Sequence, residues 1–350
     1  MASSLFLGNG RMKMKASEFI NRVLFFSAAA SLAACGESQM PIGAPSATIA
    51  ALATSPPVGL LGPSPCGWLS PEAKRERRLI YVANGGEVLI FSERAHNPSR
   101  IGCIGRPFGS SHGIYVDRRG ELYVTNGNDT VTAYARGSLT PSATYSTGSN
   151  GPMFPIVDRK GDLFVSTCCS GKVLEFLSGH STPYRTLRTP GYEDDGIALD
   201  GKGNLYVAYR TSLYSGSIDQ FAPGSSQGKS LGMLIVQPQG LVIASDGTIL
   251  LVQTGPADGV YVFRPGSTTA AFKFSVGDTP VQLAITEQEH DLMVSAFGRV
   301  ASGRIYEAPY PLSVSSHFHV KKAFYFWKDG HRRKPRFQIQ GMALGNGQMF

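Results

Sequence analysis

One short phrase recurs four times along the 350-residue chain and constrains its fold more than any other feature. The copies are GIYVDRRGELYV at 113–124, PIVDRKGDLFV at 155–165, GIALDGKGNLYV at 196–207 and GLVIASDGTILLV at 240–252. Each reads as two β-strands joined by a turn, because β-branched and aromatic residues flank a glycine-closed turn. The turn glycines are 41, 42 and 44 residues apart, at Gly120, Gly161, Gly203 and Gly247. This period predicts stacked four-stranded units rather than helical repeats.

Each end of the repeat region contains an incomplete unit, and each lacks a strand that the other could supply. Residues 79–84 resemble a second strand with no first strand before it, whereas residues 340–344 resemble a first strand. Pairing the C-terminal strand with the unit at 79–104 removes an open sheet edge, which would otherwise invite aggregation. The sequence therefore predicts an all-β, six-bladed β-propeller whose last blade is closed by N- and C-terminal strands.

Composition agrees with this architecture. The 41 glycines and 22 prolines suit a protein with many tight turns, and a charged fraction of only 17% allows a large core. The chain contains no GxGxxG or P-loop signature, so nucleotide-dependent chemistry is not supported.

The amino terminus has the features of an export signal. Lys13, Lys15 and Arg22 precede the apolar run 23–30, and Leu-Ala-Ala-Cys follows, ending at Cys35. This resembles a bacterial lipoprotein signal peptide with its lipobox. The resemblance implies a signal peptide at 1–34, lipidation of Cys35, and a lipid-anchored, extracytoplasmic location in the cell envelope. The alternatives are a plain secretory signal or a membrane span, for which the apolar run is too short.

Residues 35–65 are rich in Pro, Gly, Ser and Ala and show no strand alternation. Such a composition predicts a flexible tether, although its apolar residues could instead pack on the propeller. The propeller itself is expected to occupy 66–350.

The repeated phrase resembles NHL-repeat propellers and the gluconolactonase-like superfamily of six-bladed propellers, over roughly residues 79–350. These groups include calcium- or zinc-dependent lactonases as well as binding platforms without known catalysis. In the lactonases a Glu, two Asn and an Asp hold a metal at one channel mouth. Asp195, directly before Gly196, matches the Asp motif, and Asn150 resembles one Asn motif. No match for the Glu or the second Asn is found, so a Ca or Zn site would have few of the oxygen ligands that it needs.

The repeat register gives a second, independent set of candidates. Residues that start innermost strands should meet residues that end second strands at one channel mouth, because the two strands are antiparallel. The first group contains His112, Asp195, Gln239, Gln282 and Gln340, and the second contains Asn84, Asn126 and Tyr209. These polar side chains could bind a polar ligand or only water.

His112 and Asp195 are the candidates for acid–base catalysis, because a histidine can act as a base near neutral pH. The register places them two blades apart, across the mouth. Catalysis therefore depends on a geometry that the sequence does not show.

Four cysteines remain after Cys35, which allows three pairings. We favour a disulfide between Cys66 and Cys103, because it would attach the end of the tether to the outer strand of the closing blade. Cys168 and Cys169 could form a vicinal disulfide or remain thiols.

Positive charge is concentrated at 321–336, which holds seven basic residues and one acidic residue. We expect a basic insertion that contacts anionic lipid head groups or acidic envelope polymers. The alternative is a solvated loop. Nucleic acid is not an expected partner of an exported protein.

Together these features favour an envelope-anchored lipoprotein propeller that acts as a binding or interaction platform, with a protein among its candidate partners. The alternative is a metal-dependent, lactonase-like hydrolase that uses the mouth around Asp195. A structural cell-surface repeat protein would need no ligand.

Overall fold

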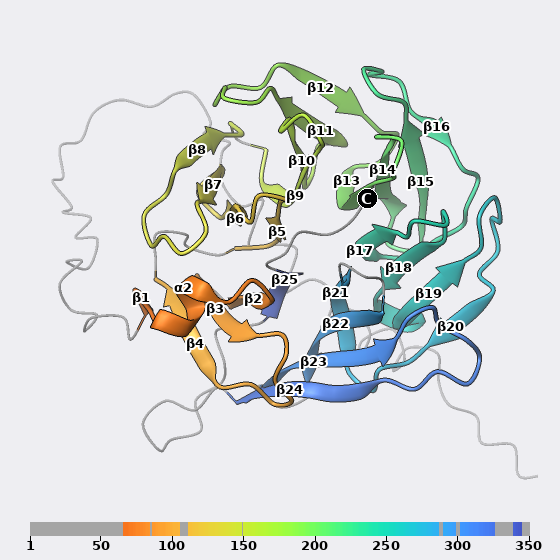
Figure 1. The fold of residues 1–350 in the computed structure, drawn as a ribbon. Coiled ribbons are helices and arrows are strands. Elements are labelled where there is room, and N and C mark those ends of the chain that lie inside the picture. Colours follow the sequence, from red (N-terminus) through yellow and green to blue (C-terminus); the bar gives the residue numbers. More distant parts are fainter. Residues whose placement is uncertain are drawn as a thin grey trace, which may run out of the picture. The chain divides into compact units, whose positions relative to one another are not determined.

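The computed structural model describes residues 66–84, 86–105, 111–148, 150–286, 290–298, 302–325 and 339–344. Within these residues the strands form six antiparallel sheets, five of four strands and one of five. Figure 1 shows the sheets arranged as blades around a central axis. The predicted six-bladed β-propeller is therefore confirmed.

The first three complete blades follow each other along the chain. Blade 1 contains β5–β8, at Ile114–Val116, Leu122–Asn126, Thr130–Tyr134 and Ala143–Ser146. Blade 2 contains β9–β12, at Pro152–Val157, Leu163–Thr167, Lys172–Phe176 and Arg185–Arg188. Blade 3 contains β13–β16, at Glu193–Leu199, Leu205–Ser212, Ser215–Phe221 and Lys229–Ser230.

The last two complete blades have the same order. Blade 4 contains β17–β20, at Pro238–Ile243, Ile249–Gln253, Gly259–Phe263 and Phe272–Phe274. The short 3₁₀ helix η1, Gly255–Ala257, joins β18 to β19. Blade 5 contains β21–β24, at Thr279–Ile285, Asp291–Gly298, Ser302–Pro309 and His319–Tyr325.

The closing blade joins the two ends of the propeller. Its sheet order is β1-β4-β3-β2-β25, with bounds Trp68–Leu69, Arg100–Ile104, Glu87–Ser92, Leu79–Asn84 and Ile339–Leu344. The C-terminal β25 pairs antiparallel with β2, aligning Val82 with Met342. The predicted closure is thus confirmed. Helix α2, Pro71–Arg75, follows β1. Neither helix in the described part of the chain has the length and apolar character needed to cross a bilayer.

The predicted basic insertion needs a correction at its start. Residues 321–325 belong to β24, the outer strand of blade 5, and Lys321 is buried with its ammonium 2.6 Å from Glu307 Oε1. An ion pair inside the sheet therefore uses a lysine that the sequence assigned to the insertion. Residues 326–336 lie outside the described part of the structure.

In the first three copies of the repeated phrase, one aspartate and one glycine build the turn. In blade 1, Asp117 Oδ1 accepts hydrogen bonds from the backbone N–H groups of Arg119 and Glu121, at 2.9 and 2.8 Å. Asp158 and Asp200 make the same pair of bonds in blades 2 and 3. The closing glycines have positive φ, for example 82° at Gly120, which favours glycine. The repeated aspartates therefore stabilise turns.

The innermost strands β5, β9, β13, β17, β21 and β25 form a ring, each contacting the next. Glycine allows them to converge. A Cβ at Gly196 would lie 2.0 Å from the carbonyl oxygen of Gln239, and one at Gly113 would lie 2.3 Å from that of Met153. The glycine of the repeated phrase is thus required by the close approach of neighbouring backbones.

Gly196→Ala is expected to lower the free energy of unfolding by about 2–3 kcal/mol, because the new methyl group would clash with backbone that cannot rotate away. Urea unfolding measures the loss. Gly266→Ala is the matched control: its Cβ would meet nothing within 4 Å, and only its φ of 75° opposes alanine. We expect a loss of about 1 kcal/mol there. Equal losses at the two positions would contradict the packing argument.

Candidate binding site at the channel mouth

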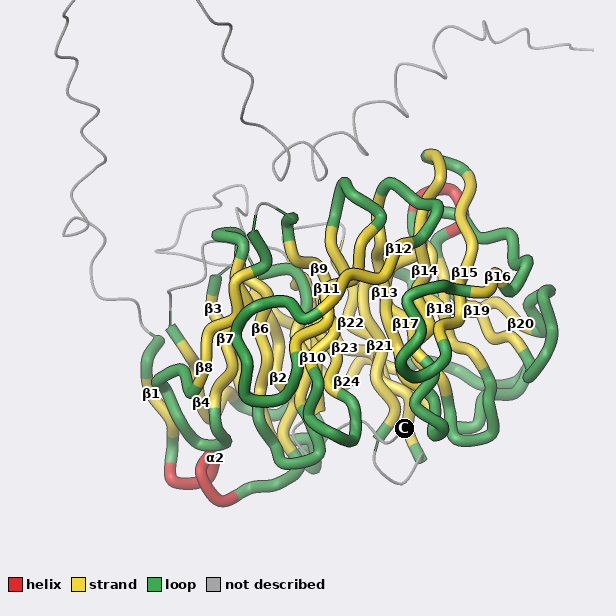
Figure 2. The backbone as a smooth tube through the Cα atoms, turned by 90° about the horizontal axis from the view of Figure 1, so that it is seen from above, coloured by secondary structure: helices red, strands yellow, loops and turns green. Residues whose placement is uncertain are grey.

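The innermost strands begin, and the second strands end, on one face of the propeller, which we call the mouth face. In Figure 2 the short helix η1 lies on this face and α2 lies on the opposite one. His112 precedes β5 in blade 1, and Asp195 lies in β13 of blade 3. No hydrogen bond joins these two side chains in the described structure, so they do not form an acid–base pair.

Gln282 ties blades together. Its Oε1 accepts a hydrogen bond from the backbone N–H of Met342 at 2.8 Å, and its Nε2 donates to the carbonyl oxygen of Ile114 at 3.3 Å. The amide thus bridges the innermost strands of blade 5, the closing blade and blade 1. Both ends of the amide are used, so Gln282 supports the ring and is not placed to hold a ligand.

Asn126 and Tyr209 turn toward the third strands of their own blades. Asn126 Nδ2 donates to Thr130 Oγ1 at 2.9 Å, and the hydroxyl of Tyr209 donates to Asp219 Oδ1 at 3.0 Å. Both side chains therefore pair with the adjacent strand of their own sheet.

The remaining mouth candidates differ in what they offer. Asn84, His112 and Gln239 are half-buried and make no side-chain hydrogen bond in the described structure. Burial lowers the pKa of His112, which favours the neutral imidazole. Cys35 and the side chain of Gln340 lie outside the described part of the structure.

Asp195 belongs to a buried ion-pair cluster in blade 3. The side chain is fully buried, and its Oδ2 lies 3.1 Å from Nε of Arg210. The guanidinium of Arg210 also pairs with Glu193, which is opposite it on the neighbouring strand. Sequence reasoning missed Arg210, although a run of three acids in an otherwise apolar strand requires a cation nearby.

Asp194 completes the cluster. Its Oδ1 accepts a hydrogen bond from Thr189 Oγ1, and desolvation raises its pKa to about 7. Burial, only partly opposed by Arg210, also raises the pKa of Asp195. One oxygen of each aspartate, Oδ2 of Asp194 and Oδ1 of Asp195, is buried and has no hydrogen-bond partner among the described residues. The site therefore presents two desolvated acceptors.

The metal-site candidates do not fit a hard cation. Asp195 is paired with Arg210, and Asn150 Oδ1 accepts a hydrogen bond from the ammonium of Lys172 at 3.3 Å. The oxygen of each candidate metal ligand thus already lies beside a positively charged side chain of the protein. Among the described residues, the only cluster of three His, Cys, Asp or Glu ligands close enough for one ion is Cys66, Glu87 and Cys103. Its sulfurs form a disulfide, which leaves no thiolate to bind metal.

The structure contains the disulfide that the sequence favoured, between Cys66 and Cys103. It joins Cys66, two residues before β1, to the strand β4. Beside it, the backbone N–H of Gly67 donates to the carbonyl oxygen of Cys103 at 2.9 Å. The entry of the chain into the propeller is therefore covalently held to the closing blade.

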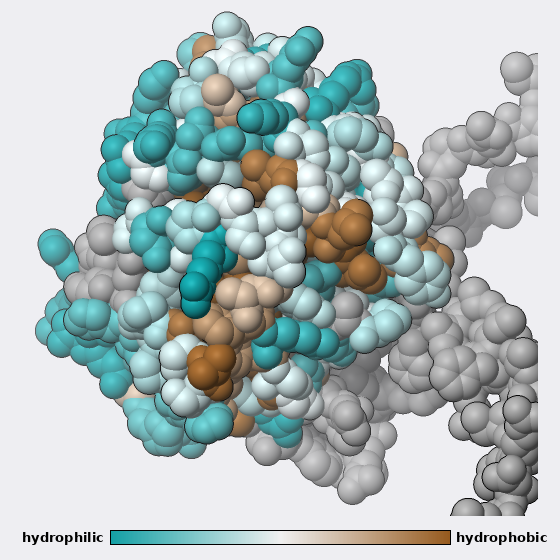
Figure 3. All heavy atoms as spheres, turned by 90° about the vertical axis from the view of Figure 1, so that its right-hand side faces the viewer, coloured by the Kyte–Doolittle hydropathy of each residue, from teal (hydrophilic) through white to brown (hydrophobic). Residues whose placement is uncertain are grey.

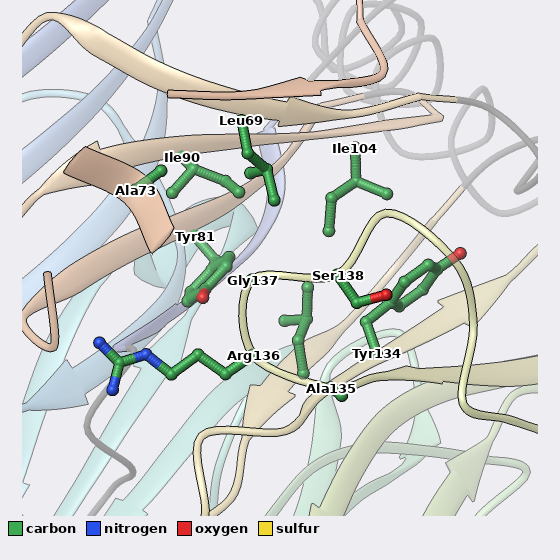
Figure 4. Close-up of a pocket in the computed structure, with 11 residues that line it drawn as sticks. Leu69, Ala73, Tyr81, Ile90, Ile104, Tyr134, Ala135, Arg136, Gly137 and Ser138 are labelled. Carbon is green, nitrogen blue, oxygen red and sulfur yellow. The ribbon is translucent and has the colours of Figure 1, made fainter. Parts of the chain in front are cut away.

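A small concavity lies between the closing blade and blade 1, near α2. Figure 4 shows it lined by Tyr81, Tyr134 and Arg136 with surrounding aliphatic side chains. Its free space holds about one water molecule. Arg136 donates to the carbonyl oxygen of Glu76, so its charge serves the contact with α2. This is an interblade packing gap rather than a ligand site.

Asp194→Asn is expected to make stability less sensitive to pH. The pKa of Asp194 is raised in the folded state to about 7 from 3.8, so the folded protein binds the proton more tightly than the unfolded chain. Ionisation therefore reduces stability as the pH rises through this interval. Relative to the parent, the variant should gain about 2–3 kcal/mol between pH 5 and pH 8. Urea unfolding at both pH values measures this, and a constant difference would contradict it.

Comparisons with known proteins support the fold. No protein-family model matches the chain, and no curated protein sequence matches it. A protein of unknown function from Bacteroides caccae has a similar structure, with a TM-score of 0.54 and 13% identity, over 71% of this chain and 98% of that one. Virginiamycin B lyase from Staphylococcus aureus gives 0.48 and 12%, over 71% and 85%. At this identity the similarity to the Bacteroides protein shows the fold alone.

Proposed function

We propose that this propeller is a binding protein that takes its ligand at the mouth face, around Asp194 and Asp195. The observation that carries the proposal is the pair of buried carboxylate oxygens without hydrogen-bond partners. An unmatched buried polar group costs about 1–3 kcal/mol. A ligand that donates hydrogen bonds to these oxygens would recover that free energy on binding.

The metal-dependent lactonase alternative receives less support. Its candidate ligands Asp195 and Asn150 face Arg210 and Lys172, and its candidate base His112 has no partner to orient it. A binding role needs neither a metal nor an oriented base.

We further propose that the protein acts as a platform anchored to a bacterial envelope through Cys35. The support is the lipobox-like sequence and the tether that ends at the Cys66–Cys103 disulfide. In bacterial expression, detergent-phase partitioning should recover the parent in the detergent phase and Cys35→Ser in the aqueous phase. Equal partitioning would refute the anchor.

The basic segment remains a proposed contact for anionic lipid head groups or envelope polymers through 328–336. The lysine at 321 is excluded from this role by its ion pair with Glu307. Neutralising Arg332, Arg333 and Lys334 should abolish sedimentation with anionic vesicles or peptidoglycan. Unchanged sedimentation would refute this contact.

A thermal-shift series on the purified full chain tests the mouth site. The panel contains calcium, zinc, sugars, lactones and amines, each with the parent and with Asp195→Asn. Because ligand binding stabilises the folded state, a true ligand should raise the midpoint by about 2–4 °C in the parent only. Absence of any mutation-sensitive shift across the panel would refute the proposed site.

A further inference from the structure

We infer that the mouth around Asp195 selects an organic cation that carries an apolar body, such as an aralkyl ammonium ion. The inference rests on the proposed binding function and assigns its ligand class. Two observations carry it: an excess of buried acceptors, and exposed apolar residues on the neighbouring loops.

The excess negative charge comes from several strands. Glu193, Asp194 and Asp195 lie together on β13, and only Arg210 among the described basic residues forms an ion pair with them. Asp219 adds a further negative charge that acts on Asp194. Burial, followed by the charges of Glu193, Asp195 and Asp129, raises the pKa of the Cys168 thiol to about 11. The three acids of β13 thus share one guanidinium, and this imbalance favours a cation as ligand.

The unpartnered groups are both acceptors, so the complementary ligand must donate. Asp194 and Asp195 are each fully buried, and each leaves one oxygen unpartnered. Ammonium and guanidinium groups carry several N–H donors and a charge, and hydrogen bonds between charged groups are about twice as strong as neutral ones. A neutral polyol would donate without offsetting the charge.

The described residues offer too few close ligands for a divalent metal ion. Among the described residues, no three His, Cys, Asp or Glu ligand atoms of this cluster lie within 4.8 Å of one another. Hard divalent cations need six or more oxygen ligands at about 2.0–2.6 Å.

Exposed apolar side chains lie on the segments next to the strands that carry the acid cluster. Tyr192 directly precedes Glu193 and lies 5.9 Å from the guanidinium of Arg210, while Leu213 and Tyr214 form the loop after β14. Gln237 Nε2 donates to the carbonyl oxygen of Leu213 at 3.3 Å and so joins this loop to the segment that carries Leu234. The exposed fractions are 42, 48, 62 and 89% for Tyr192, Leu213, Tyr214 and Leu234.

Four exposed apolar or aromatic side chains in blade 3 and the segment before blade 4 are more than scattered surface residues would give. Figure 3 views the side of the molecule formed by blades 3 and 4, where apolar side chains lie among polar ones. Tyrosine faces attract organic cations, and leucine contacts favour an apolar body. These exposed residues would therefore bind the apolar body of the ligand, while the carboxylates bind its cationic group.

Isothermal titration of the purified full chain tests the inference with four probes: phenethylamine, 2-phenylethanol, spermidine and calcium. Phenethylamine should bind most tightly, because it alone combines the charge with an apolar body. Asp195→Asn should weaken its binding at least tenfold, and Leu213→Ser with Tyr214→Ser about fivefold. Tyr184→Ser, which removes a tyrosine that is 64% exposed on blade 2, is the matched control and should leave affinity unchanged.

A readout on the parent protein keeps the test independent of variant folding. The charged and titratable groups facing the site are Glu193, Asp194, Asp195, Asp219, Asp129, Arg210, Tyr192 and Cys168. A bound cation favours ionised carboxyls and displaces a proton. Affinity for phenethylamine should therefore rise about tenfold from pH 6 to pH 8, with proton release in buffers of different ionisation enthalpy.

The outcomes separate the two proposals. Equal binding of 2-phenylethanol, or tighter binding of calcium in competition with phenethylamine, would overturn the organic-cation inference and leave a mouth site for another ligand. The organic-cation inference would also be overturned if none of these probes binds while a sugar or lactone stabilises the parent but not Asp195→Asn. If no probe and no member of the thermal-shift panel binds, the proposed function falls as well.

Discussion

Arg210→Met should lower the free energy of unfolding by about 3–5 kcal/mol at pH 7, because it leaves the buried carboxylates of Glu193 and Asp195 without their cation. Methionine fills a similar volume, so the loss reflects charge rather than a cavity. The destabilisation should shrink as the pH falls toward 5, because protonation then removes the unpaired charges. Urea unfolding followed by tyrosine and tryptophan fluorescence measures both effects.

Two further variants define what causes the loss. Combining Arg210→Met with Glu193→Gln and Asp195→Asn should recover most of the stability, because no buried charge remains. Arg94→Met removes an exposed pair in which Nε lies 3.7 Å from Glu76, and we expect a loss below about 1 kcal/mol. Failure of the triple variant to recover stability would show that Arg210 acts through packing.

Removing the Cys66–Cys103 disulfide should cost on the order of 4 kcal/mol. The bridge closes a loop with a sequence separation of 37, and constraint of the unfolded chain predicts a value of this size. The double variant Cys66→Ser with Cys103→Ser avoids an unpaired thiol. Chemical unfolding of the parent and the double variant, each under non-reducing conditions, measures the difference.

Dithiothreitol provides the internal control for this prediction. If the disulfide is responsible, the reductant should destabilise the parent toward the value of the double variant and leave the double variant unchanged. A double variant as stable as the oxidised parent would show that β1 and its pairing with β4 hold the closing blade without the bridge.

Local, periodic signals made most of the fold predictable. The turn aspartates and glycines act within a few residues of each other, so their spacing revealed each hairpin. The closure by 340–344 was also predictable. The unit at 79–104 lacks a first strand, and residues 340–344 can supply it by pairing with 79–84. The outer strand β24 was missed because its lysines suggested a loop, and Glu307 on the adjacent strand compensates one of them.

The candidate site was only partly predictable. Asp195 was found because it belongs to the repeated phrase. Arg210 lies on another strand at a position where the other blades carry unrelated residues, so no periodic signal marked it. The repeat register also did not predict the direction of side chains, since Asn126 and Tyr209 turn toward the third strands of their blades.

The six-bladed architecture, its turns and its closure follow from the amino-acid sequence alone, because they depend on hydrogen bonds and backbone conformations encoded every 41 to 44 residues. Only the tertiary structure decided which polar groups meet at the mouth. Contacts such as Gln282 with Ile114, far apart in the chain, depend on how six strands converge around one axis. The same holds for Asp194 and Asp195, each of which has one buried oxygen without a partner among the described residues.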